Sequence, residues 1–322
     1  MKKLFTKFSI KKLALVLLAL LALYSCEKGN DQADAVAQDK LMDGNVDLLD
    51  KGRYGLAQMP DAYLKSIEFL TPVDYRARIA ELRPDLVTST QKMSLTAKVA
   101  AAKNLPTPPV GDQGSEGSCV GWGVGYAAHS IARYLNNSVH QSNWSGASRS
   151  AAYIYNQIKL GNCGAGSYPN DAMNLIKNQG ECSEAQMPYI AGGCFTQPSA
   201  QQKTWAAARK TGGWFNVNPR STADIKYYLN QNYAVAVCFD VNQSFYDIRN
   251  NNHVWSSLYG SRQGGHCVCI VGYDDATGLF KVQNSWGSGW GRSGFFYVTY
   301  NNIANGAFNW AGCIIPNPGA NS

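Results

Sequence analysis

The chain has 322 residues, 45% of them hydrophobic and 11% aromatic, which is enough to bury the core of one or two domains. Its formal charge of +7 is concentrated at the start, because residues 1–25 contain five lysines and no acidic residue. Of 29 basic and 22 acidic residues in all, 24 and 22 remain in residues 26–322, a balance of +2. This balance argues against a nucleic-acid partner.

The N-terminus has the pattern of an export signal. Its lysines precede an apolar run from Leu13 to Leu23. A run of this length is typical of the core of a signal peptide and is shorter than the ~20 residues that a membrane-spanning helix needs. We therefore expect residues 1–25 to be a signal peptide and the product to be exported.

Ser25 and Cys26 end this run, and polar residues follow them. A small residue directly before a cysteine at this place is similar to the cleavage box of bacterial lipoproteins. The similarity implies a lipid on Cys26 that anchors the protein in a bacterial membrane, on the periplasmic side or at the cell surface. The alternative is an ordinary signal peptide and a secreted protein.

Residues 26–95 differ in composition from residues 96–322. Their start is polar and rich in small residues, which favours a flexible tether. Further on, Tyr63, Ile67 and Leu70 recur at near-helical spacing, as do Ile79 and Leu82, and this predicts short amphipathic helices. We interpret residues 26–95 as a tether and a possible inhibitory propeptide, which would make the chain a zymogen. A spacer between membrane and enzyme is the alternative.

Residues 96–322 contain helical patterns first and strand patterns afterwards. A long helix is predicted from Ser118 to Leu135, and its glycines at 121, 123 and 125 indicate that another backbone packs closely against it. Three further helices and four strands are predicted, the last helix opened by a capping-box pattern: helices at 151–155, 172–176 and 221–228, strands at 234–239, 267–273, 279–283 and 295–300. This order predicts an α+β protein in two lobes.

Four polar residues stand in Gly-rich surroundings along this part of the chain. Gln113 is followed six residues later by Cys119, and His266 comes 147 residues after that. Asn284, a further 18 residues on, begins the run Asn-Ser-Trp-Gly-Ser-Gly-Trp-Gly. A cysteine beside a predicted helix start, with a distant histidine and asparagine, indicates nucleophilic catalysis by a thiolate.

These motifs resemble those of the papain-like (C1) family of cysteine peptidases, over roughly residues 100–316. The resemblance implies a helical left lobe that carries Cys119 and a β-barrel-like right lobe that carries His266 and Asn284, with the active-site cleft between them. It also implies an endopeptidase that acts on proteins or peptides through an acyl-enzyme and needs no cofactor.

The resemblance assigns a role to each residue. A helix N-terminus and the His266 imidazolium would stabilise the Cys119 thiolate, and His266 would then protonate the leaving amine. Asn284 would orient the imidazole, and Trp286 would shield that hydrogen bond from water. Gln113 would donate to the oxyanion together with the backbone N–H of Cys119.

Four residues form the predicted substrate-binding set. Gly166 and Ser167 stand where the family has a Gly-Gly pair that hydrogen-bonds the substrate backbone. Gly265 directly precedes the predicted base, and Trp290 is predicted to line the leaving-group side of the cleft.

The chain departs from the family signature at two positions beside the nucleophile. Glu116 stands where the signature has a cysteine, one partner of a familiar disulfide, and Val120 stands where it has an aromatic residue. Neither change removes a group that makes or breaks bonds. We expect altered packing and retained activity.

Seven cysteines remain besides Cys26 and Cys119, an odd number that leaves at least one unpaired within the chain. Cys163, Cys182 and Cys194 are the plausible disulfide set, and their connectivity is open. Cys267 and Cys269 alternate with His266 along a predicted strand and are expected to be core thiols. No spacing provides a zinc site with a credible fourth ligand, so no metal is predicted.

Two other functions use the same residues. The thioester could be intercepted by an amine, which would make the protein an acyl transferase or amidase, although no motif favours this. A catalytically silent papain-like binding module at the cell surface is the third possibility. The presence of all four polar residues argues against it.

Overall fold

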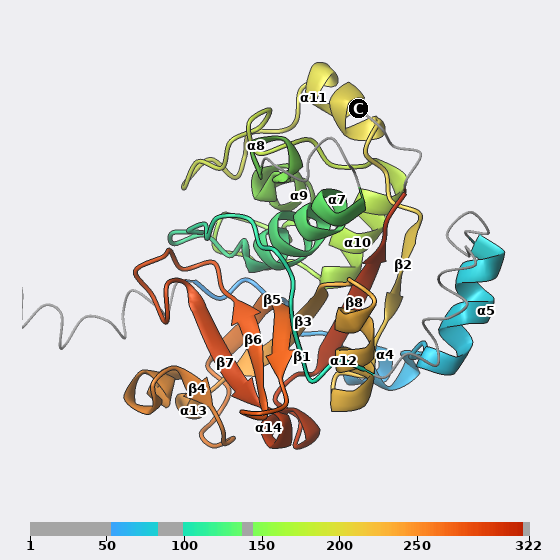
Figure 1. Cartoon of the computed structure of the whole chain (residues 1–322). Helices are drawn as coiled ribbons and strands as arrows, with labels where there is room; N and C mark the ends of the chain where they lie inside the picture. The colour runs from blue at the N-terminus through green and yellow to red at the C-terminus, as the bar shows by residue number, and fades with distance from the viewer. Residues whose placement is uncertain (1–52, 83–98, 137–143, 318–322) are drawn as a thin grey trace, which may run out of the picture. The chain divides into compact units, whose positions relative to one another are not determined.

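The computed structural model describes residues 53–82, 99–136 and 144–317 (Figure 1). The predicted signal peptide, Cys26 and the polar start of the tether lie outside these ranges. Within them, every helix is too short or too polar to span a bilayer.

Helices make up the first lobe. They are η2 (Gly121–His129), α7 (Ser130–Asn136), α8 (Trp144–Ala147), α9 (Ala151–Ile158), α10 (Pro169–Asn178) and α11 (Ala200–Ala207). The start of α9 is capped by Ser150, whose hydroxyl accepts from the Tyr153 N–H at 3.0 Å. The two helices predicted at 151–155 and 172–176 are confirmed as α9 and α10, both of which extend further.

The central helix begins at Cys119 and continues as η2 and α7. Residues 121–129 form π-helical turns where an ordinary α-helix was expected. Other backbone segments pack closely against the glycines, as predicted. A Cβ at Gly123 would lie 3.1 Å from the carbonyl carbon of Cys267, and one at Gly121 would lie 2.6 Å from the Ala151 carbonyl oxygen. The helix can therefore lie directly against the second lobe.

The second lobe is built on one sheet. Its strands are β1 (Ala102–Asn104), β2 (Gly213–Asn216), β3 (Val235–Val241), β4 (Val254–Trp255), β5 (Gly264–Asp274), β6 (Leu279–Gln283), β7 (Phe295–Thr299) and β8 (Trp310–Ile315). Their order is β2-β8-β3-β5-β6-β7-β4, with β1 added to the end of β5. The α+β fold in two lobes is confirmed. The sheet stays open in the described residues, whereas a barrel-like lobe was expected, because β2 and β4 lie at opposite ends of the order.

Strand β5 is the centre of this lobe and is buried along almost all its length. The central helix covers it on the side of Gly123, and this is why its sequence is an apolar run without clear alternation. The neighbouring Phe239 on β3 contacts the rings of Phe245, Trp255 and Phe308. Short helices complete the lobe: α12 (Thr222–Asn230), α13 (Gln243–Tyr246), η3 (Asp247–Asn251) and α14 (Tyr300–Ala304).

Residues 53–57 contact both lobes, whereas residues 70–75 pack against the second lobe. Helix α4 (Asp61–Ser66) ends before Ile67, so the predicted helical spacing from Tyr63 to Leu70 is only partly correct. Helix α5 (Pro72–Leu82) contains the second predicted segment and lies at the side of the molecule beyond β2 in Figure 1. Its Tyr75 ring contacts Phe215 and Tyr228, which anchors the helix.

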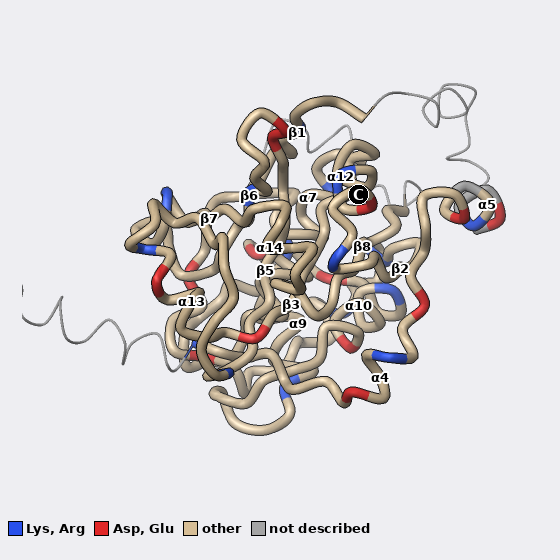
Figure 2. The backbone as a smooth tube through the Cα atoms, turned by 90° about the horizontal axis from the view of Figure 1, so that it is seen from below, with Lys and Arg blue, Asp and Glu red and all other residues tan. Residues whose placement is uncertain are grey.

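Charged positions of both signs are spread along the described backbone. In the view of Figure 2, short segments of Lys and Arg and of Asp and Glu are scattered over a tube that consists mostly of other residues. The small excess of positive charge is therefore not concentrated on the face seen there.

Candidate active site

The loop before the central helix joins the two lobes. Gln113 is positioned by a backbone hydrogen bond to the second lobe, because its N–H donates to the carbonyl oxygen of Ser285 at 2.9 Å. Asp112 and Trp286 form an isolated antiparallel bridge beside it. Gly114, at φ +59°, turns the chain towards Cys119. The first-lobe pair Gln113 and Cys119 is thereby brought to the segment that carries Asn284.

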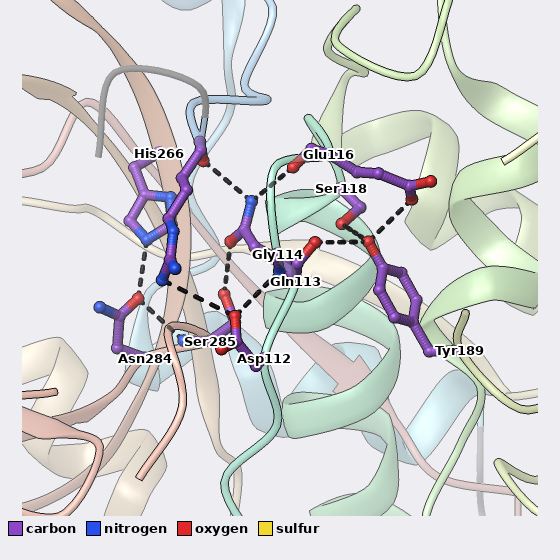
Figure 3. Close-up of polar contacts among 10 residues, drawn as sticks. Asp112, Gln113, Gly114, Glu116, Ser118, Tyr189, His266, Asn284 and Ser285 are labelled. Carbon is purple, nitrogen blue, oxygen red and sulfur yellow. Dashed lines mark hydrogen bonds and ion pairs between the residues drawn. The ribbon is translucent and has the colours of Figure 1, made fainter. Parts of the chain in front are cut away.

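His266 and Asn284 form the predicted pair on the second lobe (Figure 3). The His266 Nε2 lies 2.8 Å from the Asn284 Oδ1. An amide oxygen only accepts, so Nε2 carries the proton and Nδ1 is the basic nitrogen. Nδ1 is buried and has no hydrogen-bond partner among the described residues. It is the nitrogen that remains for exchange of a proton with a thiol.

Trp286 packs against the imidazole, while its predicted shielding of the His266–Asn284 hydrogen bond stays a prediction. The two ring centroids are 4.7 Å apart, and Trp286 is itself buried. Trp290 contacts Trp286 edge-on at 5.1 Å and stacks on Phe245 at 6.2 Å. The contact of Trp290 with substrate stays a prediction.

The side chain of Gln113 is held at both ends. Its Nε2 donates to the Glu116 and Arg53 carbonyl oxygens, each at 2.8 Å. Its Oε1 accepts from the Ser285 hydroxyl at 2.7 Å. Ser285 thus fixes which way the amide points, a role that sequence reasoning missed although this serine lies between Asn284 and Trp286 in the motif.

The second lobe and an N-terminal segment surround the Cys119 thiol. Burial, followed by the neighbouring Cys267, raises the pKa of Cys119, while backbone hydrogen bonds from Gly55, Cys267 and Val120 act in the opposite direction. Burial lowers the pKa of His266 to about 4, against the hydrogen bond of Asn284 and assisted by the Arg53 cation. A neutral thiol and a neutral imidazole are therefore favoured in this state. The expected ion pair is not favoured here, because the cleft is covered.

Residues 53–57 are the cover. The Leu56 N–H donates to the Gly265 oxygen at 3.0 Å. The Ala57 N–H donates to the Ser167 oxygen at 3.1 Å, and the Ser167 N–H donates to the Gly55 oxygen at 2.9 Å. Two members of the predicted substrate-binding set, Ser167 and Gly265, thus bind backbone that belongs to the same chain.

Glycines allow this segment to approach so closely. A Cβ at Gly166 would lie 2.5 Å from the Gly55 oxygen, and one at Gly265 would lie 2.8 Å from the Leu56 oxygen. Gly55 is the tightest position, since a Cβ there would lie 1.8 Å from the Gly117 oxygen. Such distances exclude any side chain without a shift of backbone.

The cysteines outside the site include one disulfide. Cys163 pairs with Cys194, and Cys182 is a buried free thiol, which resolves the connectivity that the sequence left open. Cys267 and Cys269 are buried and free, as expected. Among the described residues, donor atoms of Glu116, Cys163 and Cys194 lie within 4.8 Å of one another. Because the two sulfurs form the disulfide, they offer no thiolate, and we assign no metal there.

A two-lobed α+β fold with a cysteine at a helix start, a histidine held by an asparagine and a buried glutamine amide that donates to the Arg53 carbonyl defines the class of papain-like cysteine peptidases. The family model described as "Papain family cysteine protease" matches residues 96–312. The chain belongs to this family.

Curated relatives agree with this assignment. "Gamete and mating-type specific protein A" of Dictyostelium discoideum is 29% identical over 201 residues, which are 60% of this chain and 41% of the relative. "Uncharacterized peptidase C1-like protein L477" of Acanthamoeba polyphaga mimivirus is 28% identical over 208 residues, 60% of this chain and 65% of the relative. The matches therefore span roughly half the length of these relatives.

Solved structures share the fold. Xylellain, a cysteine protease from Xylella fastidiosa, has a TM-score of 0.61 at 21% identity and is covered over 97% of its length by 83% of this chain. The structure titled "proCathepsin B S9 from Trypanosoma congolense" has a TM-score of 0.59 at 18% identity, with 84% of this chain and 88% of that chain covered.

Proposed function

We propose that the protein is a cysteine endopeptidase that hydrolyses peptide bonds through an acyl-enzyme on Cys119. The observation that carries the proposal is the His266 Nε2–Asn284 Oδ1 hydrogen bond, which leaves Nδ1 as the basic nitrogen, buried and without a partner among the described residues. The family membership and the fold support it.

The reaction begins when residues 53–57 leave the cleft. Water then reaches His266, its pKa rises, and the imidazole accepts the proton of Cys119. The thiolate attacks the substrate carbonyl, and the Gln113 Nε2 together with the Cys119 N–H stabilises the negative oxygen. His266 returns its proton to the leaving amine and afterwards activates water to release the acid.

A peptide-mimicking thiol alkylator tests this proposal. After proteolytic removal of the N-terminal segment, the adduct should be located on Cys119 by mass spectrometry, and Cys119→Ser should take up none. Reporter amides should be hydrolysed, with free acid as the main product even when an added amine is present. Aminolysis as the dominant outcome would support the acyl transferase alternative. No adduct at Cys119 would overturn both enzymatic functions and favour a silent binding module.

The protein is made as a zymogen in this proposal, with residues 53–57 as the inhibitory part of the predicted propeptide. Tyr54 contacts Trp286, which packs against Trp290 of the predicted leaving-group side, and Leu56 then pairs in parallel with Ser167 on the other side. A substrate would place its acyl part near Ser167 and its leaving part near Trp290. The segment therefore runs in the opposite direction, so its peptide bonds are not aligned for acyl transfer. A spacer would not require these contacts.

Export and membrane anchoring complete the proposal, supported by the lysine-rich start, the apolar run and Cys26. In a bacterial host the protein should fractionate with membranes. Cys26→Ser should move it to the soluble exported fraction. Unchanged fractionation of this variant would contradict a lipid anchor at Cys26.

A further inference from the structure

The hydroxyl of Tyr189 contacts the oxyanion loop, the segment from Gln113 to Cys119, at three points (Figure 3). Its oxygen lies 2.8 Å from the Gln113 carbonyl oxygen, 2.8 Å from the Glu116 Oε2 and 2.7 Å from the Ser118 hydroxyl. Gln113 supplies one proposed oxyanion donor, and Ser118 directly precedes Cys119, whose N–H is the other. One side chain from outside the loop therefore holds it beside both donors.

A second tyrosine contacts the substrate-binding loop, the segment from Cys163 to Ser167. The hydroxyl of Tyr155, on helix α9, donates to the carbonyl oxygens of Cys163 at 2.7 Å and of Ala165 at 2.6 Å. The two carbonyls share its one proton. The last two residues of this loop belong to the predicted substrate-binding set, so Tyr155 holds the backbone that leads directly to them.

The two loops are also joined to each other. The Gly117 N–H donates to the Cys163 carbonyl oxygen at 2.8 Å. The substrate-binding loop has a covalent link as well, because Cys163 pairs with Cys194, which follows Tyr189 by five residues. The oxyanion loop has no such link, since its one cysteine is the nucleophile Cys119. It depends on hydrogen bonds alone, and three of its contacts are with one hydroxyl.

Neither loop has regular secondary structure to fix its carbonyl groups. Residues 113–118 lie outside the helices and strands, and so do residues 163–166. A buried carbonyl that loses its donor is costly, so the backbone around it would shift towards another partner. Burial raises the pKa of Tyr155 and of Tyr189, and both hydroxyls therefore remain protonated donors at neutral pH.

We propose that the two tyrosines are positioning residues with separate tasks. Tyr189 holds the oxyanion loop for stabilisation of the transition state, and Tyr155 holds the substrate-binding loop for recognition of the substrate backbone. Both act through the loops and not by contact with the reacting atoms. The proposal rests on the proposed peptidase function, because it names residues that support the same site.

Removal of each hydroxyl from the activated enzyme separates the two tasks. Tyr189→Phe should lower kcat about tenfold to a hundredfold with little change in KM, because misplaced oxyanion donors weaken only the transition state. Tyr155→Phe should raise KM about threefold to tenfold with little change in kcat, because its loop binds the ground state and the transition state alike. Tyr126→Phe is the matched control. Its hydroxyl donates to the Pro109 oxygen at 2.8 Å, outside both loops, and its removal should leave kcat and KM unchanged.

The split between the two kinetic constants decides the assignment. Wild-type kcat in Tyr189→Phe would overturn the positioning of the oxyanion donors. Wild-type KM in Tyr155→Phe would overturn the positioning of the substrate-binding loop. Parallel changes of kcat and KM in both variants would show a general loosening of the lobe and would contradict separate tasks.

A peptide aldehyde gives a readout that a merely structural role would not move. The Cys119 sulfur bonds to the aldehyde carbon, the thiol proton moves to the carbonyl oxygen, and this oxygen then lies at the oxyanion donors. Tyr189→Phe should therefore bind the aldehyde at least tenfold more weakly than wild type. Iodoacetamide, which has no peptide part, should alkylate Cys119 equally fast in both. Equal aldehyde affinity, or an equal loss of affinity and of alkylation rate, would contradict a role in oxyanion binding.

Amide hydrogen exchange in the full, uncleaved chain tests both loops without any turnover. Compared with wild type, residues 113–119 should exchange faster in Tyr189→Phe, and residues 163–167 should exchange faster in Tyr155→Phe, as measured by mass spectrometry of peptides. Unchanged exchange in a loop would overturn the role of its tyrosine. The expected changes in a protein that does not label at Cys119 after activation would support the positioning of the loops and contradict the peptidase function alone.

Discussion

The side-chain amide of Gln113 donates to the carbonyl oxygen of Arg53 at 2.8 Å. The other N–H of this amide is held by the Glu116 oxygen, so the one that reaches Arg53 is the one available to an oxyanion. A carbonyl of the chain itself thus occupies the proposed oxyanion site. The full burial of Cys119 and His266 follows from the same cover.

Gly55→Ala should uncover the active site. The new Cβ would lie 1.8 Å from the Gly117 oxygen and 2.0 Å from its carbonyl carbon, atoms of a backbone that cannot move without displacing Cys119. The segment must therefore leave the cleft. We expect Cys119 in the uncleaved variant to be alkylated at least tenfold faster than in the uncleaved wild type, measured by mass spectrometry over time.

Gly289→Ala is the control for this substitution. No heavy atom lies within 4 Å of a Cβ at Gly289, so the labelling rate should equal that of wild type. After proteolytic removal of the N-terminal part of the chain through residue 59, the Gly55 variant and wild type have the same sequence and should have the same activity. An uncleaved Gly55→Ala chain that labels as slowly as wild type would show that residues 53–57 do not protect the thiol.

Ser285→Ala should slow turnover through Gln113. Without the 2.7 Å hydrogen bond to Oε1, the amide can rotate and present its oxygen to the developing negative charge. We expect kcat to fall about tenfold, against about 10²–10³-fold for Gln113→Ala. The double variant should be no slower than Gln113→Ala alone, because the serine acts only through the glutamine. Additive losses in steady-state kinetics would contradict this coupling.

The proposed catalytic residues could be located in the sequence because each belongs to a short motif with a fixed local geometry. Cys119 begins a helix, His266 lies in an apolar strand, and Asn284 starts a Gly-rich run. The strand with the clearest limits, Leu279–Gln283, is observed as predicted. Strands β2 and β8 were missed, since a short strand and a wholly buried strand lack the alternation that identifies a half-buried one.

The cover of the cleft could not be predicted in detail. Residues 53–57 are Arg-Tyr-Gly-Leu-Ala, and they contain neither a helical period nor a strand alternation. Their conformation comes from pairing with Ser167 and Gly265, more than a hundred residues away. The contacts of the Tyr189 hydroxyl with Gln113, Glu116 and Ser118 also come from tertiary packing. They span 71 to 76 residues in sequence, so no local pattern reveals them.

The Cys163–Cys194 disulfide should stabilise the first lobe by restricting the unfolded chain. It closes a loop with a sequence separation of 31, and chain-entropy arguments assign about 3–4 kcal/mol to such a loop. A Cys163→Ser/Cys194→Ser variant should lose this amount in the free energy of unfolding, measured with urea. Cys182→Ser, which changes a buried free thiol of the same lobe, controls for the substitution itself. Equal stability of wild type and the double variant would contradict the prediction.

Acid should destabilise the covered form through His266. In Cys119→Ser no thiolate can form, so only the imidazole exchanges a proton at the site. Burial lowers the pKa of His266 to about 4 from its ordinary 6.5, and the unfolded state therefore binds more protons between these values. The stability from this group is complete above about pH 6.5 and is lost as the pH falls towards 4, amounting to about 3 kcal/mol.

Cys119→Ser/His266→Gln should lose less stability over the same range in urea unfolding. The buried His129, whose pKa is also lowered, remains in both variants and cancels in the comparison. Parallel pH dependences for the two variants would rule out the contribution of His266.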